Sequence, residues 1–450
     1  MKLAPLFVLA VAVLAGAAAA QPAPAGSAAG AGAPLGSGSP TGSKAGTGAA
    51  TGEATGSGSA GGSGATAGSD AGEPMFEPEH VSSGKPAPPP AEKTAANEPI
   101  TVDQLIIAAT ARLDFNFFGD VSLLKLNGLD PGFAIGPLGF QVTAHLADGL
   151  VGRTEYAMSF DNGETVVDVE RAFLEYRVGH WMFAAGRTHA EFGYWNNAFH
   201  HGRWLQLTIN RPHVVRFEDE GGMLQVHQVG VTAVYGPKRG EHGLEVALGI
   251  GNGHGPSIVD VQTLGDNNLA KSVLIRVGAV GLGHDALRFG VNLGFDEIAA
   301  EPVTVRPLLP DTSIFEVITG VYGALRSDTW IALSEIYNVF HRAAGKSWQI
   351  TDGFLLGGYR LGRYIPYAQV EARHGDGLTD PFYNPDPMAS PEATIPSNYV
   401  EGILGLHYDL STWSALKLEL SGRRFQTLEP GGVVANNNDY RVELNWSFGR

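Results

Sequence analysis

The feature that most constrains this chain is a repeated alternation of apolar and polar residues in segments longer than ordinary strands. The stretch YRVELNWSF at 440–448 puts Tyr, Val, Leu, Trp and Phe on one face and the polar residues on the other, because successive side chains of a strand point to opposite faces. Leu416, Leu418 and Leu420 alternate with polar residues in the same way. Such segments are about 8 to 14 residues long, against ~5 to 6 for a strand of a soluble sheet. A tilted strand needs this length to cross a bilayer.

Sixteen such segments follow one another, and the connections between them sort by parity. Even-numbered connections are short, as in LADG, GH, RSD and LST, whereas several odd-numbered ones are long and polar. Outer-membrane barrels have this arrangement, with short periplasmic turns and long outer loops. The predicted strands lie at 104–118, 137–147, 151–161, 166–178, 180–188, 223–236, 243–252, 270–279, 286–295, 313–324, 329–340, 347–361, 363–373, 398–410, 413–425 and 438–448.

The two patterns together predict an all-β fold, a transmembrane antiparallel β-barrel of about 16 strands. Every backbone amide in hydrocarbon needs a partner, and only a closed sheet has no free edge. The apolar faces then contact lipid, and the charged faces line a lumen wide enough for water. Aromatic residues near the strand ends are typical of interfacial girdles. These residues are Tyr156, Trp181, Tyr235, Trp330, Tyr359, Tyr399, Tyr408 and Trp413.

Two segments of different composition precede the barrel, which is predicted at 101–450. Residues 1–20 contain a lysine, an apolar run and a small-residue end, the pattern of a secretory signal peptide. Residues 21–100 are almost entirely Gly, Ser, Ala, Thr and Pro, which predicts a disordered low-complexity tether. The chain has 0 cysteines, so it has no lipid-modified cysteine, disulfide or thiolate metal ligand. We therefore expect export through the general secretory route.

The chain resembles the Gram-negative outer-membrane porins in four features. These are the number of strands, the alternation of short and long connections, the segment FAAGRTHAEFG at 183–193, and a last strand that ends in aromatic residues. Among these porins the chain is similar to the phosphate-selective-porin type, with its sixteen-stranded barrel, over roughly residues 102–448. The resemblance implies a channel without enzymatic activity or cofactor, located in the outer membrane, through which small hydrophilic solutes or ions diffuse passively. It also implies a homotrimer. Phosphate selectivity in that family depends on basic residues laddered through the pore, and this chain has 30 Lys and Arg against 46 Asp and Glu. Inorganic phosphate is therefore not the expected solute.

The connection at 189–222 stands out because it is the longest between predicted strands and contains the aromatic stretch FGYWNNAFHHGRW. In trimeric porins the third outer loop folds into the channel and sets its bore, so the resemblance implies the same position here. Residues 203–211 alternate weakly, but a seventeenth strand would put one terminus outside, and a loop is favoured. The candidate constriction residues are Trp195, His200, His201, Glu218, Asp219 and Glu220.

Arginines on the polar faces of three consecutive predicted strands are candidates for the pore wall. Facing the acidic end of the third loop, they would create a transverse field across the constriction. The alternative is that they pair with Glu155 and Glu175 on their own strands, and both arrangements can hold together. The candidate pore-lining residues are Arg153, Arg171, Glu175 and Arg187.

Other functions find less support in the sequence. Glu191, His200, His201, His213 and His227 lack any spaced ligand motif, so no metal site is predicted. An outer-membrane barrel enzyme is not indicated, because no nucleophile motif such as G-x-S-x-G occurs. A structural or anchoring barrel remains open. The net charge of −16 suits contact with outer-membrane lipid and lipopolysaccharide through divalent ions, and we expect no nucleic-acid partner.

Overall fold

A computed structural model describes a large part of the predicted barrel region. The described residues are 112–127, 130–161, 164–199, 203–216, 221–238, 241–256, 265–266, 268–281, 286–384, 398–429 and 433–450. The predicted signal peptide and tether lie outside these residues, as does the first part of the strand predicted at 104–118. None of the helices in the described ranges is long and apolar enough to cross a membrane.

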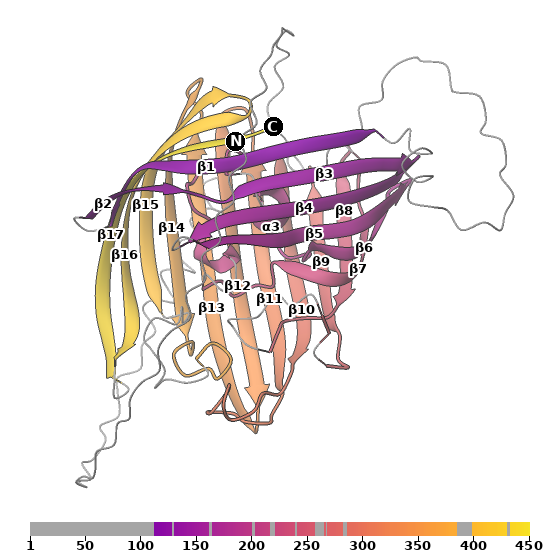
Figure 1. Ribbon diagram of the computed structural model, residues 1–450, viewed down its shortest axis with the longest axis vertical. Coiled ribbons are helices and arrows are strands. Elements are labelled where there is room, and N and C mark those ends of the chain that lie inside the picture. The colour runs from indigo at the N-terminus through magenta and orange to yellow at the C-terminus, as the bar shows by residue number, and fades with distance from the viewer. Residues whose placement is uncertain are drawn as a thin grey trace, which may run out of the picture. The chain divides into compact units, whose positions relative to one another are not determined.

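Within the described ranges, seventeen strands form one antiparallel sheet, whose arrangement Figure 1 shows. Two short helices, α3 (Trp195–Phe199) and the 3-10 helix η1 (His213–Val215), lie between β6 and β7. The strands are β1 (Leu113–Asn127), β2 (Asp130–Ile135), β3 (Leu138–Ala147), β4 (Leu150–Asp161), β5 (Glu164–Val178), β6 (Trp181–His189), β7 (His227–Tyr235), β8 (Gly243–Gly251), β9 (Ser272–Val280), β10 (Leu287–Ile298), β11 (Ile314–Arg326), β12 (Trp330–Ala343), β13 (Lys346–Tyr359), β14 (Tyr364–Gly375), β15 (Tyr399–Ser411), β16 (Ser414–Glu429) and β17 (Val433–Gly449).

The first strand closes the sheet into a barrel. β1 pairs with β17 from Phe118, opposite Gly449, to Asn127, opposite Arg441. On its other edge β1 pairs with β3 through its first half and with β2 through its second half. β2 and β3 therefore together occupy one strand position in the barrel wall, so the barrel has sixteen strand positions. Pro137 lies between β2 and β3 and has no N–H to donate, which suits a break in the hydrogen-bond ladder.

Fifteen of the sixteen predicted strands overlap β3 to β17, and the described part of the first, from residue 113 to 118, lies in β1. The predicted end at 118 is wrong, because β1 continues to Asn127, and the short β2 was not predicted. The reason is a bulge: the pairing of β1 with β17 shifts register between Ser122 and Leu124. A bulge breaks the period of two, so the alternation that locates the other strands is lost in this part of β1.

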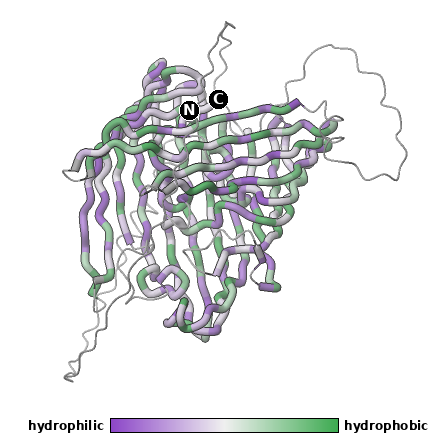
Figure 2. The backbone as a smooth tube through the Cα atoms, viewed as in Figure 1, coloured by the Kyte–Doolittle hydropathy of each residue, from purple (hydrophilic) through white to green (hydrophobic). Residues whose placement is uncertain are grey.

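Hydrophobic and hydrophilic residues alternate along the strands (Figure 2), and the apolar side chains are exposed on the outer face while the polar ones are buried on the inner face. Leu174, Val231 and Leu404 are more than half exposed on the outer face. Inner-face residues such as Lys417 and Asn445 are fully buried. The wall therefore presents its apolar side outward, as a lipid-facing barrel must.

Aromatic side chains lie on the outer face at the strand ends next to the short turns. Contacting ring pairs are Trp181 with Tyr235, Trp330 with Tyr359, and Tyr364 with Tyr408, at 5.0, 4.6 and 4.7 Å between centroids. Their position matches an interfacial girdle. The prediction for Tyr399 is wrong, because this residue is 5% exposed and its hydroxyl donates inward to Asp352 at 3.1 Å.

Candidate functional site

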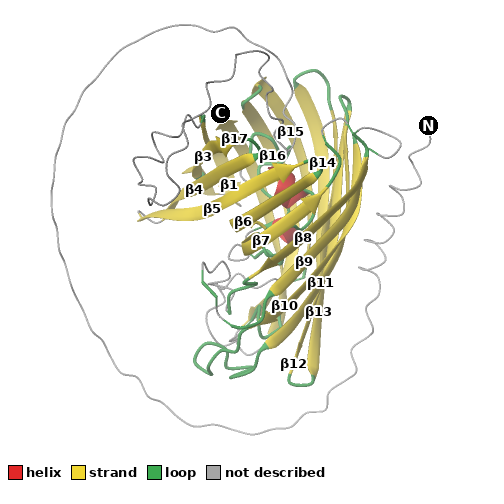
Figure 3. Cartoon of the chain, turned by 90° about the vertical axis from the view of Figure 1, so that its right-hand side faces the viewer, coloured by secondary structure: helices red, strands yellow, loops and turns green. Residues whose placement is uncertain are grey.

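The connection between β6 and β7 enters the ring of strands, where α3 is seen in both views (Figures 1 and 3). It is the connection predicted to be the third outer loop, and we call it the third loop. Phe192, Trp195 and Ile209 belong to this loop and yet are at most 1% exposed. Phe192 and Trp195 share an apolar cluster with inner-face residues of the wall, including Tyr337 and Phe354.

The first part of the third loop is held through its backbone. Tyr194 and Trp195 donate their N–H groups to one oxygen of Glu335 on β12, at 3.0 and 2.6 Å, and Gly193 donates to Asn292 on β10 at 3.0 Å. These N–H groups precede or begin α3, so they have no partner within the helix. Gly193 has a φ of 62°, and a Cβ there would overlap the carboxylate of Glu335. Only glycine allows this close approach.

Aromatic packing seats the same part of the loop on the wall. Trp195 contacts Phe354 of β13 and Phe199 of α3, with ring centroids 5.5 and 4.9 Å apart. Phe192 meets Tyr337 of β12 edge to face at 6.2 Å. Burial of a large apolar side chain is worth about 1.5–3 kcal/mol, so these contacts contribute substantially to the attachment of the loop.

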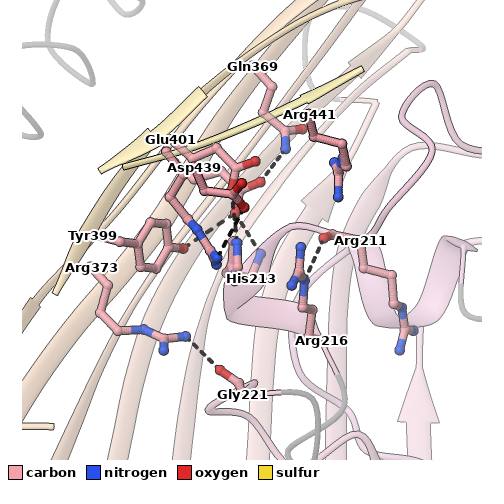
Figure 4. Close-up of polar contacts among 12 residues, drawn as sticks. Arg211, His213, Arg216, Gly221, Gln369, Arg373, Tyr399, Glu401, Asp439 and Arg441 are labelled. Carbon is pink, nitrogen blue, oxygen red and sulfur yellow. Dashed lines mark hydrogen bonds and ion pairs between the residues drawn. The ribbon is translucent and has the colours of Figure 1, made fainter. Parts of the chain in front are cut away.

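The second part of the loop reaches β14 and β15 through His213 of η1 (Figure 4). The backbone N–H of His213 donates to Glu371 at 2.6 Å, and its Nε2 lies 2.9 Å from Glu401. Arg373 donates to the carbonyl of Gly221 at 2.9 Å, which ties down the end of the same loop. The loop therefore crosses the lumen, and it is attached to the wall both near its beginning and near its end.

Burial sets the protonation of His213. Loss of solvent, together with the positive charge of Arg216, lowers the pKa of His213 to about 3, although Glu401 acts in the opposite direction. The imidazole is therefore neutral at physiological pH, and its Nε2 donates a hydrogen bond to Glu401 rather than forming a full ion pair. Protonation would place an additional charge in a buried setting, which is costly.

The predicted pore-wall residues lie on the inner face. Arg171 pairs with Glu155, and its Nε lies 2.6 Å from that carboxylate. Arg177 donates to Glu175 at 2.5 Å, and Arg187 donates to the carbonyl of Glu170 at 3.1 Å. Pairing along the wall, the alternative left open by the sequence, thus holds for Arg171.

Part of this wall meets the third loop at a cavity. A space of about 90 Å³ is lined by Arg153, Arg171 and Glu175 of the wall together with Gly193 and Tyr194 of the loop. Arg153 also lies over the ring of Phe173, 5.7 Å from its centroid. Three predicted wall residues therefore share a space large enough for several water molecules with the loop, whereas Arg187 does not line it.

The predicted constriction residues divide into two groups. Trp195 is buried at the inner wall and acts as an anchor of the loop, so it does not face open space. His200, His201, Glu218, Asp219 and Glu220 lie outside the described residues. The transverse field expected from the acidic residues stays a prediction.

The third loop is not the only connection that packs inward. The segment after β14, predicted as part of a long polar outer loop, buries Phe382 and Tyr383, each at 2% exposure. Asp380 of this segment lies 2.7 Å from His341 of β12, whose other ring nitrogen is 2.9 Å from Glu316. The contacts of Asp380 and Glu316 with His341, together with the buried rings of Phe382 and Tyr383, thus hold this polar segment inside the barrel. The adjacent aromatics were the signal for this packing.

Of the residues weighed as metal ligands, those in the described ranges have other partners, whereas His200 and His201 lie outside these ranges. Glu191 pairs with Arg276 at 2.7 Å, and His227 lies 3.0 Å from Glu170. Burial raises the pKa of Glu191, and Arg276 opposes that rise. Among the residues that the structure describes, no three His, Cys, Asp or Glu side chains are arranged to hold a metal ion.

Comparison with known proteins gives likeness in structure alone. No family model and no curated protein matches the sequence. The anion-selective porin from Comamonas acidovorans superposes with a TM-score of 0.51 at 10% identity, over 76% of this chain and 100% of that chain. A loop-deletion mutant of OmpT, an outer membrane protein of Vibrio cholerae, gives 0.50 at 13%, over 76% and 100%.

The outer membrane channel DcaP of Acinetobacter baumannii gives a TM-score of 0.49 at 13% identity, over 75% of this chain and 97% of that chain. Identities this low establish the fold and do not single out the phosphate-selective type that the sequence resembles. The chain has the fold of the outer-membrane barrels, with sixteen strand positions in a closed antiparallel sheet and a long third loop inside it.

Proposed function

We propose that this protein is a porin of the Gram-negative outer membrane, which forms a water-filled channel for passive diffusion of small hydrophilic solutes or ions. The observation that carries the proposal is a closed barrel with an apolar, aromatic-edged outer face and a charged interior that holds the third loop. An apolar exterior suits lipid, and a charged interior suits water. The chain does this without enzymatic chemistry or a cofactor.

In this proposal the third loop narrows the channel, and the wall arginines together with the loop act on passing ions. The cavity shared by Arg153, Arg171 and Tyr194 supports this arrangement, because wall and loop meet there around polar space. Charges that line a narrow, partly desolvated passage bias which ions enter. The acidic residues at 218–220 would add the opposing charge.

Swelling of liposomes tests the proposal. Liposomes containing the refolded protein and loaded with an impermeant polymer should swell in isotonic arabinose and more slowly in larger sugars. A heat-denatured sample provides the control. Liposomes that fail to swell in any small solute would contradict the channel.

Assembly as a homotrimer is part of the proposal. The outer side of β5 to β8 carries an apolar hollow of about 420 Å³, lined in part by Leu174, Phe183, Val231 and Ile250. The apolar strands of a neighbouring copy would fill such a hollow, while lipid and lipopolysaccharide would cover the remaining outer face. A monomeric mass in mild detergent would contradict the trimer.

A structural or anchoring barrel is the second candidate, favoured by the dense interior. Glu155, Lys417 and Asn445 face inward and are at most 1% exposed. A barrel filled to this degree along part of its wall can hold the envelope together without conducting. Liposomes that take up the protein as a heat-modifiable barrel and yet do not swell would support this candidate.

A further inference from the structure

A lysine and a glutamate of β16 hold one peptide group of the third loop. The Nζ of Lys417 donates to the carbonyl of Thr208 at 2.9 Å, and Glu419 accepts from the N–H of Ile209 at 2.6 Å. The carbonyl of Thr208 and the N–H of Ile209 belong to the same planar peptide unit. Lys417 and Glu419 are two positions apart, so they share the inner face of the strand.

Further contacts fix the two side chains in place. Lys417 also donates to the carbonyl of Arg203, and the guanidinium of Arg203 lies 2.7 Å from Asp120 of β1. Glu419 accepts a second hydrogen bond from the hydroxyl of Tyr367 at 2.7 Å. Lys417 is 0% exposed and Glu419 is 1% exposed. Hydrogen bonds from charged groups in such a setting are stronger than those between neutral groups.

The strand itself does not depend on these side chains. Lys417 is paired through the backbone with Asn445 on β17 and with His407 on β15, in registers that continue on both sides of it. Loss of the side chain therefore removes this one attachment of the loop and leaves the ladder of the barrel in place.

We propose that Lys417 and Glu419 are positioning residues that clamp the Thr208–Ile209 peptide and thereby hold the third loop in the conducting position. This inference rests on the proposed porin function. It assigns to two buried polar side chains a role in conductance, although neither residue faces the passing solute.

Three variants test the clamp in planar bilayers. Lys417→Met removes the donors at nearly constant size, Lys417→Arg keeps charge and donors, and Arg423→Met removes a cation from the same face of β16. Arg423 contacts Phe425 and Asp439 instead of the loop, with its guanidinium 4.5 Å from the ring and 3.7 Å from the carboxylate.

Lys417→Met should populate the released loop about 10-fold more, because a hydrogen bond to a charged group is lost. We expect larger single-channel conductance and larger open-channel noise in Lys417→Met, and wild-type noise in Lys417→Arg and Arg423→Met. Wild-type conductance and noise in Lys417→Met would overturn the clamp.

A labelling experiment measures loop release without relying on conduction. The chain has 0 cysteines, so Gln206→Cys introduces a single thiol at a loop position that is 1% exposed. This thiol should react slowly with a maleimide in the otherwise unchanged barrel and about 10-fold faster when Lys417→Met is added. Rapid labelling of Gln206→Cys alone overturns the clamp even if Lys417→Met does not refold. A wild-type barrel that conducts no ions contradicts the porin function, while slow labelling in it still supports the clamp.

Discussion

Replacement of Trp195 by alanine should release the first part of the third loop. Trp195 is 0% exposed and contacts Phe354 and Phe199 through its ring, at 5.5 and 4.9 Å. Truncation of a buried aromatic side chain costs about 3–5 kcal/mol. The strands remain paired, so this cost falls on the attachment of the loop. A change of this size raises the rate of amide exchange through local opening by roughly 150- to 5000-fold.

Hydrogen exchange read by mass spectrometry on the peptide that covers 194–199 measures this effect in the refolded barrel. Trp330→Ala is the matched control, because Trp330 is 57% exposed on the outer face and contacts Tyr359 rather than the loop. The control should leave exchange in 194–199 unchanged. Wild-type exchange in Trp195→Ala would refute the reasoning that aromatic packing seats the loop.

Three further predictions concern the same loop. Deletion of 196–210 should raise single-channel conductance, and an unchanged value would place the loop outside the permeation path. Neutral amides at Glu218 and Asp219 should shift the reversal potential in a salt gradient toward anions, and Arg171→Ala toward cations; if neither moves it, these charges do not act on the passing ions. The folded-state pKa of His213 lies near 3, below its ordinary value of 6.5, so the folded barrel binds fewer protons than the unfolded chain. Stability from this group is full above about pH 6.5 and is lost as pH falls toward 3. The drop in unfolding midpoint between pH 7 and pH 4 should therefore be smaller in His213→Gln, and an equal drop would contradict the assignment.

Most of the fold follows from local pattern. A strand that faces lipid on one side and water on the other must alternate, so β3 to β17 could each be located from their own residues. The second part of β1 was not located, because the register shift between Ser122 and Leu124 interrupts the alternation where β1 pairs with β17. Closure of the barrel requires pairing between β1 and β17, which lie at opposite ends of the barrel sequence. The local periodicity of either strand does not predict this pairing.

The site was only partly predictable. The aromatic composition of 192–204 indicated a loop that packs against the wall, and Trp195 does so. Its partners were not predictable, because Glu335 and Glu419 meet the loop across separations of 140 and 210 residues. Charged residues of the inner face also have two different roles, binding the loop or pairing along the wall, and the alternation pattern does not distinguish them. Glu419 binds a loop N–H, whereas Arg171 pairs with Glu155 along the wall.

Single-channel recording in a planar bilayer tests the central claim most directly. The refolded full chain should insert in discrete steps, each a steady conductance that is linear in voltage at low potential. The third loop is attached to β10, β12, β14 and β16, so we expect one dominant conductance level rather than continuous flicker. Barrels that insert, as shown by heat-modifiable migration of the recovered protein, and yet leave the membrane sealed would contradict a water-filled channel.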